Sequence, residues 1–256
     1  ILRSEVAMER IVRRSIDARR RDVRVELSVE VYVDGERQPD PVHFDYPDVS
    51  HRTEVAVVGS GPAGLFAALR LIELGYRPLV FERGREVLQR KRDIAQINRN
   101  GAVDPDSNYA FGEGGAGTFS DGKLFTRSKK RGDYNKALQV LVFHGASPEI
   151  LYEAHPHIGT DRLPRIISNI RQTIEQAGGR FFFGRRITSL IIREGRVTGV
   201  MCGDEQIDAA AVVLATGHSA RDIYHMLYDC GVRLEAKPFA MGVRIEHPQA
   251  LIDSIP

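Results

Sequence analysis

A glycine-rich turn constrains the fold more than any other part of the sequence. The pattern G-x-G-x-x-G is formed by Gly59, Ser60, Gly61, Pro62, Ala63 and Gly64. The apolar run 54–58 before it is typical of a strand buried on both faces, and residues 62–75 after it have a helical pattern. Residues 78–82 form a second apolar run. This β-α-β unit predicts an α/β fold with a parallel sheet.

Each glycine of the turn has a physical role in binding a dinucleotide. Gly59 permits the tight turn, Gly61 lets the backbone approach a pyrophosphate, and Gly64 lets the helix pack closely on the sheet. N–H groups at the helix N-terminus attract phosphate, and Pro62 suits this first turn because its missing N–H would have no partner. Glu82, at the end of the second strand, can accept hydrogen bonds from an adenosine ribose. A glycine-rich turn that binds nothing is the alternative.

The order of the later segments favours FAD over a hydride-shuttling NAD domain. An NAD domain would bring its third strand soon after the acidic residue, but the run R-F-F-F at 180–183 comes about a hundred residues later. Residues 187–209 alternate through two turns, which predicts an inserted three-stranded β-meander. The next apolar run leads into Ala215-Thr216-Gly217, where the chain can pass close to a cofactor. This layout is typical of a Rossmann-like, glutathione-reductase-like FAD-binding domain with a helical insertion at about 85–160.

Several stretches resemble a bacterial family of FAD-dependent dehydrogenases whose members are mostly uncharacterised. They are VGSGPAGLFAALRL, VFERG, FGEGGAGTFSDGKL, HIGTDRL, VVLATGHSARD and EAKPFAMGVRIEHPQALID. The resemblance covers nearly the whole chain and implies an FAD-binding oxidoreductase. Family members are much longer, so a sequence that begins with Ile1 and ends in LIDSIP is expected to be a fragment. The resemblance implies that it lacks a later glycine-aspartate motif and most of a substrate domain.

The stretch FGEGGAGTFSDGKL is close to a triphosphate-binding loop, because residues 117–124 read G-x-x-x-x-G-K-L. Leu124 cannot supply the hydroxyl that binds magnesium, and no buried strand precedes the stretch, so this interpretation fails. The resemblance implies cofactor contacts instead, and a mobile surface loop is the alternative. The candidate residues are Gly114, Gly115, Ala116, Gly117, Thr118, Ser120, Asp121 and Lys123.

Other candidates each have two interpretations. Ile187 stands where such domains often hold the adenine edge, which is compatible with a place in the core. Arg83 can reach a phosphate or ribose, or remain a solvated surface residue. His218 can face the cofactor, or cap a helix. Four residues of a substrate-side segment can bind an anionic substrate or form an ion network: Lys237, Arg244, Glu246 and His247.

No residue is a convincing catalytic acid or base, and the catalytic residues stay unknown. His155 and His157 have no partner at metal-ligand spacing, so no metal site is expected. Cys202 and Cys230 form no C-x-x-C pair, which argues against disulfide reduction and favours a reducing, cytoplasmic setting.

The chain divides into three predicted parts. Residues 1–50 are expected to form a small α+β module and a linker, 51–231 the FAD-binding domain, and 232–256 the start of a substrate-side domain. In the first part, 23–33 alternates as a half-buried strand that ends in a turn at 34–35. Met8, Ile11, Val12 and Ile16 have roughly helical spacing, although an extended segment also fits. Further helices are predicted at 136–144, at 149–154, from a cap at Thr160 to Gly178, and at 221–230.

Composition restricts the partners. The 36 basic and 34 acidic residues leave a net charge of +2, which gives no general attraction to nucleic acid or membranes. No apolar run approaches the ~18 residues of a membrane helix, and no signal-peptide pattern opens the chain. The basic run 13–21 lacks interleaved aromatics, so a solvated face is favoured over an RNA site.

These observations favour a cytoplasmic FAD-dependent oxidoreductase that acts on a small substrate, with NAD(P)H as a candidate electron donor. Two alternatives stay open. One is a dinucleotide-binding or sensing module without catalysis, and the other is a flavin-dependent enzyme that modifies RNA. The oligomeric state stays open as well.

Overall fold

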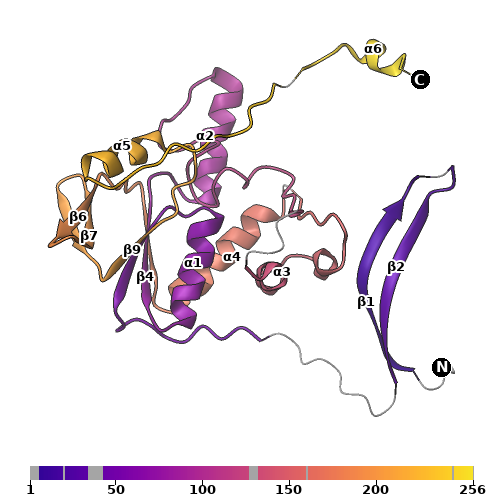
Figure 1. The fold of residues 1–256 in the computed structure, drawn as a ribbon, viewed down its shortest axis with the longest axis horizontal. Coiled ribbons are helices and arrows are strands. Elements are labelled where there is room, and N and C mark those ends of the chain that lie inside the picture. The colour runs from indigo at the N-terminus through magenta and orange to yellow at the C-terminus, as the bar shows by residue number, and fades with distance from the viewer. Residues whose placement is uncertain are drawn as a thin grey trace.

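The computed structural model describes residues 6–19, 21–33, 43–126, 132–159, 161–243 and 245–255. The strands are β1 (Val6–Asp17), β2 (Arg24–Val33), β3 (Glu54–Val58), β4 (Arg77–Glu82), β5 (Arg180–Phe183), β6 (Ser189–Arg193), β7 (Arg196–Cys202), β8 (Glu205–Asp208) and β9 (Ala211–Leu214). The helices are α1 (Pro62–Glu73), α2 (Val87–Asn100), α3 (Tyr134–Phe143), α4 (Leu163–Gln176), α5 (Arg221–Asp229) and α6 (Gln249–Asp253), with a 3₁₀ turn at Pro148–Leu151. Figure 1 shows an α/β body beside the long β1–β2 hairpin.

A parallel sheet of order β5-β4-β3-β9 forms the centre of the body. The predicted α/β fold is therefore confirmed, including the late third strand. Alternate residues of β3 face opposite layers. Val57 belongs to the core shared with α1 and α4, whereas Ala56 and Val58 belong to the core shared with the meander.

Helices α1 and α4 cover one face of the sheet, and apolar side chains at helical spacing hold them there. On α4 the buried residues are Ile166, Ile167, Ile170 and Ile174, as the sequence pattern predicted. The predicted cap Thr160 lies outside the described residues, and α4 begins after Arg162 without a side-chain cap. Gly178, with φ of +93°, follows its end.

The opposite face is covered by the antiparallel meander β6-β7-β8, whose prediction is confirmed. Glu194 and Gly195, with φ of 51° and 74°, form the tight turn between its first two strands. Val200 on the meander packs in one cluster with Phe81 on the central sheet. The result is three layers, with the meander, the parallel sheet and the helices stacked in that order.

The N-terminal module differs from the prediction, because its described residues form a hairpin and no helix. Residues with roughly helical spacing, such as Ile11 and Ile16, lie in β1, where each pairs with a valine of β2. β-branched residues fit a pleated strand better than a helix, and pairing with β2 decides between the two patterns. The predicted half-burial of β2 is also wrong, since Val25, Leu27 and Val29 are exposed. The predicted turn at 34–35 lies outside the described residues.

Three further segments refine the predictions. The expected helix at 149–154 is a single 3₁₀ turn, because Tyr152 and Ala154 instead bond the backbone of Arg14 on β1. Val49 in the predicted linker is buried, and its N–H bonds the carbonyl of Ala177 at 2.8 Å. Within the described part of 232–248 the chain forms no helix or strand. None of the described helices is long and apolar enough to cross a bilayer.

Candidate functional site

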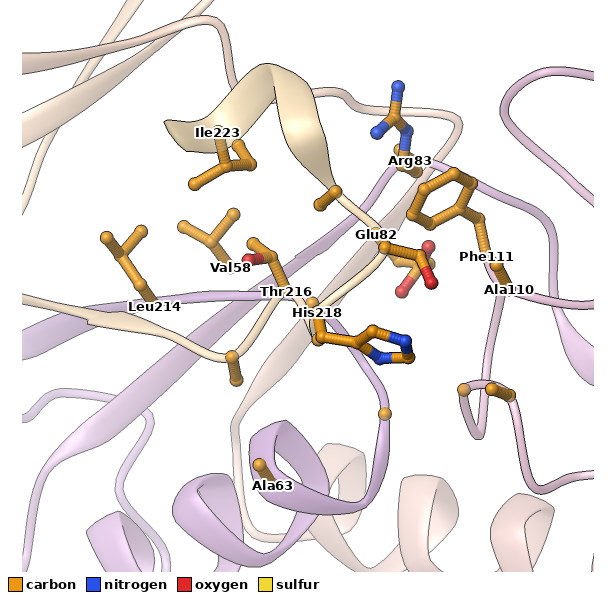
Figure 2. A pocket seen from close by; sticks show the side chains of 18 of the residues that line it. Val58, Ala63, Glu82, Arg83, Ala110, Phe111, Leu214, Thr216, His218 and Ile223 are labelled. Atoms are coloured by element: carbon orange, nitrogen blue, oxygen red, sulfur yellow. The ribbon is translucent and has the colours of Figure 1, made fainter. Parts of the chain in front are cut away.

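A cavity of about 610 Å³ opens where the carboxyl ends of β3, β4 and β9 meet the start of α1. The sheet order reverses here between neighbouring crossovers, which is where α/β folds bind ligands. Figure 2 shows side chains from the strand ends, α5 and the loop before Gly112 converging on it. The predicted residues that line it are Gly59, Gly61, Pro62, Ala63, Glu82, Arg83, Gly115, Ala116, Gly117, Ile187, Ala215, Thr216, Gly217 and His218.

The glycine turn is built so that no side chain fits at two of its three glycines. A Cβ on Gly59 would lie 2.5 Å from the carbonyl oxygen of Ala215, and the residue has φ of +103°. A Cβ on Gly64 would lie 1.9 Å from the carbonyl oxygen of Gly59. At Gly61 the nearest atom would be the Cα of Gly115, at 3.7 Å, so a Cβ there would make only an ordinary van der Waals contact. These contacts agree with the three roles expected from the pattern.

The N-terminus of α1 is left open for an anion. Its cap residue, Gly61, has no side chain to accept a hydrogen bond, and Pro62 follows in the first turn. In the described part of the chain, the N–H groups of Ala63 and Gly64 bond no protein acceptor. Both lie in the first turn, where the helix dipole is positive. This is the arrangement that holds a phosphate group at a helix N-terminus.

Glu82 is buried at the end of β4 and borders the cavity. One carboxylate oxygen accepts the Ser60 N–H at 2.9 Å and the Ser60 hydroxyl at 2.8 Å. The other accepts the N–H groups of Gly84 and Gly112 at 2.9 and 3.1 Å. The carboxylate thus ties the glycine turn to the glycine-rich loop. A ribose hydroxyl that donates to Glu82 would replace the Ser60 hydroxyl most easily, because that hydroxyl can rotate.

The glycine-rich stretch is an ordered loop against the turn. The N–H of Gly114 bonds the Ser60 carbonyl at 2.9 Å, and a Cβ on Gly115 would lie 3.1 Å from the Cα of Gly61. Thr118 is fully buried and bonds loop carbonyls, so its side chain does not reach the cavity. Several predicted residues do not line the cavity: Ser60, Gly64, Gly114, Thr118, Ser120 and Asp121. Lys123 instead pairs with Asp121 at 3.2 Å.

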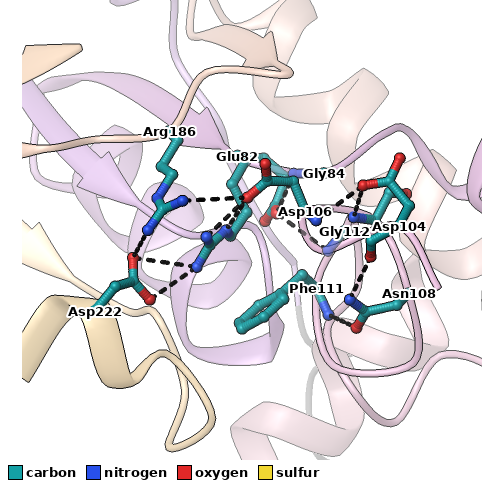
Figure 3. Close-up of polar contacts among 11 residues, drawn as sticks. Glu82, Gly84, Asp104, Asp106, Asn108, Phe111, Gly112, Arg186 and Asp222 are labelled. Carbon is teal, nitrogen blue, oxygen red and sulfur yellow. Dashed lines mark hydrogen bonds and ion pairs between the residues drawn. The ribbon is translucent and has the colours of Figure 1, made fainter. Parts of the chain in front are cut away.

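Arg83 joins three walls of the cavity, a place that neither of the two sequence interpretations described. Its guanidinium donates hydrogen bonds to Asp106 at 2.8 Å and to Asp222 on α5 at 3.0 Å. The guanidinium carbon also lies over the Phe111 ring, 4.3 Å from the ring centroid. Arg186 also bonds Asp222, at 3.0 Å. Figure 3 shows Arg186 reaching both carboxylates. These four charged residues, Arg83, Asp106, Arg186 and Asp222, are called the charge quartet below.

Substitution of Asp222 tests the quartet. Partial burial alone would raise the pKa of Asp222, but the hydrogen bond from Arg83 and the charges of Arg83 and Arg186 outweigh it and hold the pKa below its ordinary value of 3.8. The ionised carboxylate therefore stabilises the fold above about pH 4, and this contribution is lost as the pH falls through the lowered pKa. Asp222→Asn is expected to remove this acid-dependent part of the unfolding free energy and to weaken FAD binding about threefold.

Urea denaturation at pH 7 and pH 3 measures the effect of Asp222→Asn on the unfolding free energy. Asp229→Asn, at an exposed position of α5, should change neither quantity, and a parent-like pH profile in Asp222→Asn would contradict the prediction.

Several residues that line the cavity were not predicted from the sequence. The segment around α5 contributes Ser219, Ala220, Asp222, Ile223, Tyr224 and Leu227, and other segments contribute Val58, Ala110, Phe111, Gly112, Arg186 and Leu214. No sequence pattern marks α5 as a wall of the cavity. Its apolar side, with Ile223 and Met226, was visible as a helical pattern but not assignable to a partner.

The remaining candidates have clear places. His218 projects into the cavity from the segment after β9 (Figure 2). Ile187 is buried and lines the cavity, so it combines the two interpretations that the sequence left open. Of the substrate-side candidates, Lys237, Glu246 and His247 are exposed, and Arg244 lies outside the described residues.

The residues present fit FAD. The cavity volume is within the ~300–1,000 Å³ of small-molecule sites. The open N-terminus of α1 suits a diphosphate, the Glu82 carboxylate suits a ribose, and apolar side chains such as Val58 and Leu214 suit ring systems. Across the described segments, no cluster of three or more His, Cys, Asp or Glu side chains could hold a metal ion. Both cysteines are free, and neither lines the cavity.

Comparisons with known proteins agree with this geometry. Residues 53–235 match the family model described as pyridine nucleotide-disulphide oxidoreductase, and residues 3–32 match a domain of unknown function. An uncharacterised protein of Clostridium beijerinckii is 40% identical over 95% of this chain and 48% of its own length. The chain therefore spans about half the length of that relative.

Two further proteins are more distantly similar. YdiS of Escherichia coli, a probable electron transfer flavoprotein-quinone oxidoreductase, is 30% identical over 64% of this chain and 36% of its own. The crystal structure of THI4 from Thermovibrio ammonificans is 21% identical, covers 70% of this chain and 62% of its own, and has a TM-score of 0.47. The family match spans well over half of the chain and includes the whole cavity body from β3 to α5. The chain belongs to the pyridine nucleotide-disulphide oxidoreductase family.

Proposed function

We propose that this chain supplies the FAD-binding part of a cytoplasmic oxidoreductase that acts on a small substrate, with NAD(P)H as an electron donor. One observation carries the proposal: the open N-terminus of α1, the Glu82 carboxylate and the glycine-rich loop surround a single cavity. The name of the relative YdiS, a flavoprotein oxidoreductase, supports the same class. When bound, the flavin supplies the electron-transfer chemistry, and the protein supplies binding and orientation.

The groups of the chain divide the work of binding. The free N–H groups of Ala63 and Gly64 hold the diphosphate at the helix N-terminus. Glu82 accepts the ribose hydroxyls and, being anionic, repels a 2′-phosphate. The charge quartet joins α5 to the end of β4 and so keeps the wall of the cavity in place. Val58, Leu214 and neighbouring apolar side chains line the space and would exclude water from the bound rings.

An absorbance spectrum of the purified protein, both as this chain and at full length, tests the proposal. Flavin bands near ~450 nm are expected, either as isolated or after addition of FAD, and they should bleach when NADH or NADPH is added to the full-length protein. A protein that takes up no FAD would overturn the cofactor assignment. A protein that binds FAD but is neither reduced nor reoxidised by any donor would instead be a non-catalytic binding or sensing module.

The described residues offer no observation that favours an RNA-modifying enzyme. Within and beside the basic run, Arg10 pairs with Glu30, Arg14 with Glu153 and Arg19 with Asp17. The N···O distances are 2.8, 3.3 and 2.8 Å. Paired arginines attract a phosphate backbone less than free ones do. Disulfide reduction is likewise unsupported, because neither Cys202 nor Cys230 lines the cavity.

A further inference from the structure

Arg90 on α2 is fully buried and has no role in the site as described so far. Burial lowers its pKa to about 10, while the charges of Glu82, Glu113 and Asp93 act in the opposite direction, so the side chain stays cationic at neutral pH. A buried cation is costly unless its N–H groups are bonded. Here the partners are one hydroxyl and a series of backbone carbonyls. They are the carbonyl oxygens of Asn108, Tyr109, Gly112, Glu113 and Gly115, and the hydroxyl of Thr118, at 2.8–3.3 Å.

The loop returns a matching contact to the helix. The carboxylate of Glu113, which is also fully buried, accepts the N–H of Val87 at 2.7 Å, at the open start of α2. Its other oxygen accepts Nε of Arg171 on α4 at 2.8 Å. Arg90 on α2 therefore bonds the loop, and Glu113 in the loop bonds the start of α2. Buried hydrogen bonds in both directions rigidify the segment from Asn108 to Thr118.

The hydrogen bond from Arg90 to the Gly115 carbonyl sets the direction of the peptide group between Gly115 and Ala116 at the cavity. The carbonyl of Gly115 accepts Nη1 of Arg90 at 2.8 Å and the hydroxyl of Thr118 at 2.9 Å. In a trans peptide the N–H points opposite to the C=O, so the N–H of Ala116 points away from Arg90. Ala116 is exposed and lines the cavity together with its neighbours. No acceptor for this N–H is found among the described residues.

We propose that Arg90 is a positioning residue of the cofactor site: by holding the Gly115 carbonyl, it presents the N–H of Ala116 to the diphosphate of the dinucleotide. The place of the loop supports the choice of diphosphate, because Gly115 lies against Gly61 at the start of α1. The Ala116 N–H would then add a donor for the diphosphate beside those of the helix N-terminus. The inference rests on the proposed dinucleotide site but does not require that the protein catalyses a redox reaction.

This role needs the planar guanidinium group of arginine, so another cationic side chain cannot take it over. Lysine keeps the cation but has three N–H groups at one point, and it cannot reach carbonyls spread from Asn108 to Gly115. Arg90→Lys should therefore release the Gly115 carbonyl and leave the Ala116 N–H misdirected. Arg92→Lys is the matched control, because Arg92 lies on the same helix and is exposed.

Equilibrium binding of FAD, ADP and adenosine to the two variants and the parent chain tests the proposal. For Arg90→Lys, the Kd of FAD and of ADP should rise about tenfold, the loss of one charge-supported hydrogen bond, while the Kd of adenosine stays unchanged. In ¹⁵N-labelled protein, the Ala116 amide resonance should move when ADP binds to the parent and stay in place in Arg90→Lys. Arg92→Lys should match the parent throughout.

Other outcomes have definite meanings. Parent-like ADP binding by Arg90→Lys, or an equal loss for ADP and adenosine, would overturn the proposal, because the second result indicates a collapsed loop rather than a lost diphosphate donor. If Arg90→Lys does not fold, Thr118→Val replaces it, since Thr118 bonds the same carbonyl; ADP affinity should then fall about threefold, and no change would count against the proposal. In a further outcome, the parent and its variants all fail to bind FAD while ADP still binds more weakly to Arg90→Lys than to the parent. That result would rule out the flavin function and leave the positioning role of Arg90 supported.

Discussion

Gly64→Ala is expected to abolish FAD binding and to lower the free energy of unfolding by about 3 kcal/mol, at the upper end of the cost of overpacking a core. The new methyl group would lie 1.9 Å from the backbone carbonyl oxygen of Gly59. No side-chain rotation relieves a clash with backbone, so α1 must move away from the glycine turn. The open N–H groups at its N-terminus would move with it, and the diphosphate would lose its main binding groups. Urea denaturation and titration with FAD measure the two effects.

Two further glycine substitutions separate folding from binding. Gly61→Ala places its Cβ 3.7 Å from the nearest atom, an ordinary contact, so the unfolding free energy should stay close to that of the parent. Its methyl group would stand where the diphosphate approaches, and FAD affinity should fall about thirtyfold. Gly242→Ala is the control for both measurements, because an added Cβ there meets no atom of the described residues within 4 Å. Parent-like stability in Gly64→Ala would show that α1 does not need this close approach.

Glu82→Gln is expected to lower the unfolding free energy by about 3 kcal/mol and FAD affinity by about a hundredfold. The carboxylate accepts four hydrogen bonds from the protein, two on each oxygen. An amide has only one oxygen, so its NH₂ group would face either the pair of donors at Ser60 or the N–H groups of Gly84 and Gly112. Buried donors would lose their acceptor, which costs about 1–3 kcal/mol each.

Differential scanning calorimetry and FAD titration of Glu82→Gln check this expectation. Glu235→Gln is the control, because Glu235 is exposed and pairs only with Arg233, at 3.2 Å, among the described residues. It should change stability by no more than about 0.5 kcal/mol. If Glu82→Gln lost FAD affinity without losing stability, the carboxylate would serve the ribose alone. If it lost stability without losing affinity, the joining of turn and loop would be its whole role.

The local parts of the fold were readable from the sequence. The strand before Gly59, helix α1 and the strand that ends at Glu82 follow from short-range patterns, and so does the meander with its turn at Glu194-Gly195. In these segments the hydrophobic period and the turn residues agree with one another. Where two periods fitted, the sequence misled: β1 had helical spacing, and only its pairing with β2 made it a strand.

The cofactor residues divide along the same line. Gly59, Gly61 and Glu82 could be predicted to lie at one site, and all three line the cavity, because their positions depend on a turn and on two strands that are neighbours in the chain. Thr118 was assigned to the cofactor, yet it is buried beneath the loop, since its distance from the cavity depends on how α2 and the loop are fastened together. Asp222 was missed, because it reaches Arg83 across 139 positions of sequence.

The sequence by itself determined the β-α-β unit, the dinucleotide turn and the order of strands around an FAD-type domain. Their signals are short-range: backbone angles that only glycine tolerates, helix starts and hydrophobic periods. Only the tertiary structure decided that α5 closes the cavity, that the charge quartet holds it, and that Arg90 carries the glycine-rich loop. These features depend on burial and on partners far apart in the chain. The sequence does not distinguish an arginine that bonds five buried carbonyls from an arginine exposed to solvent.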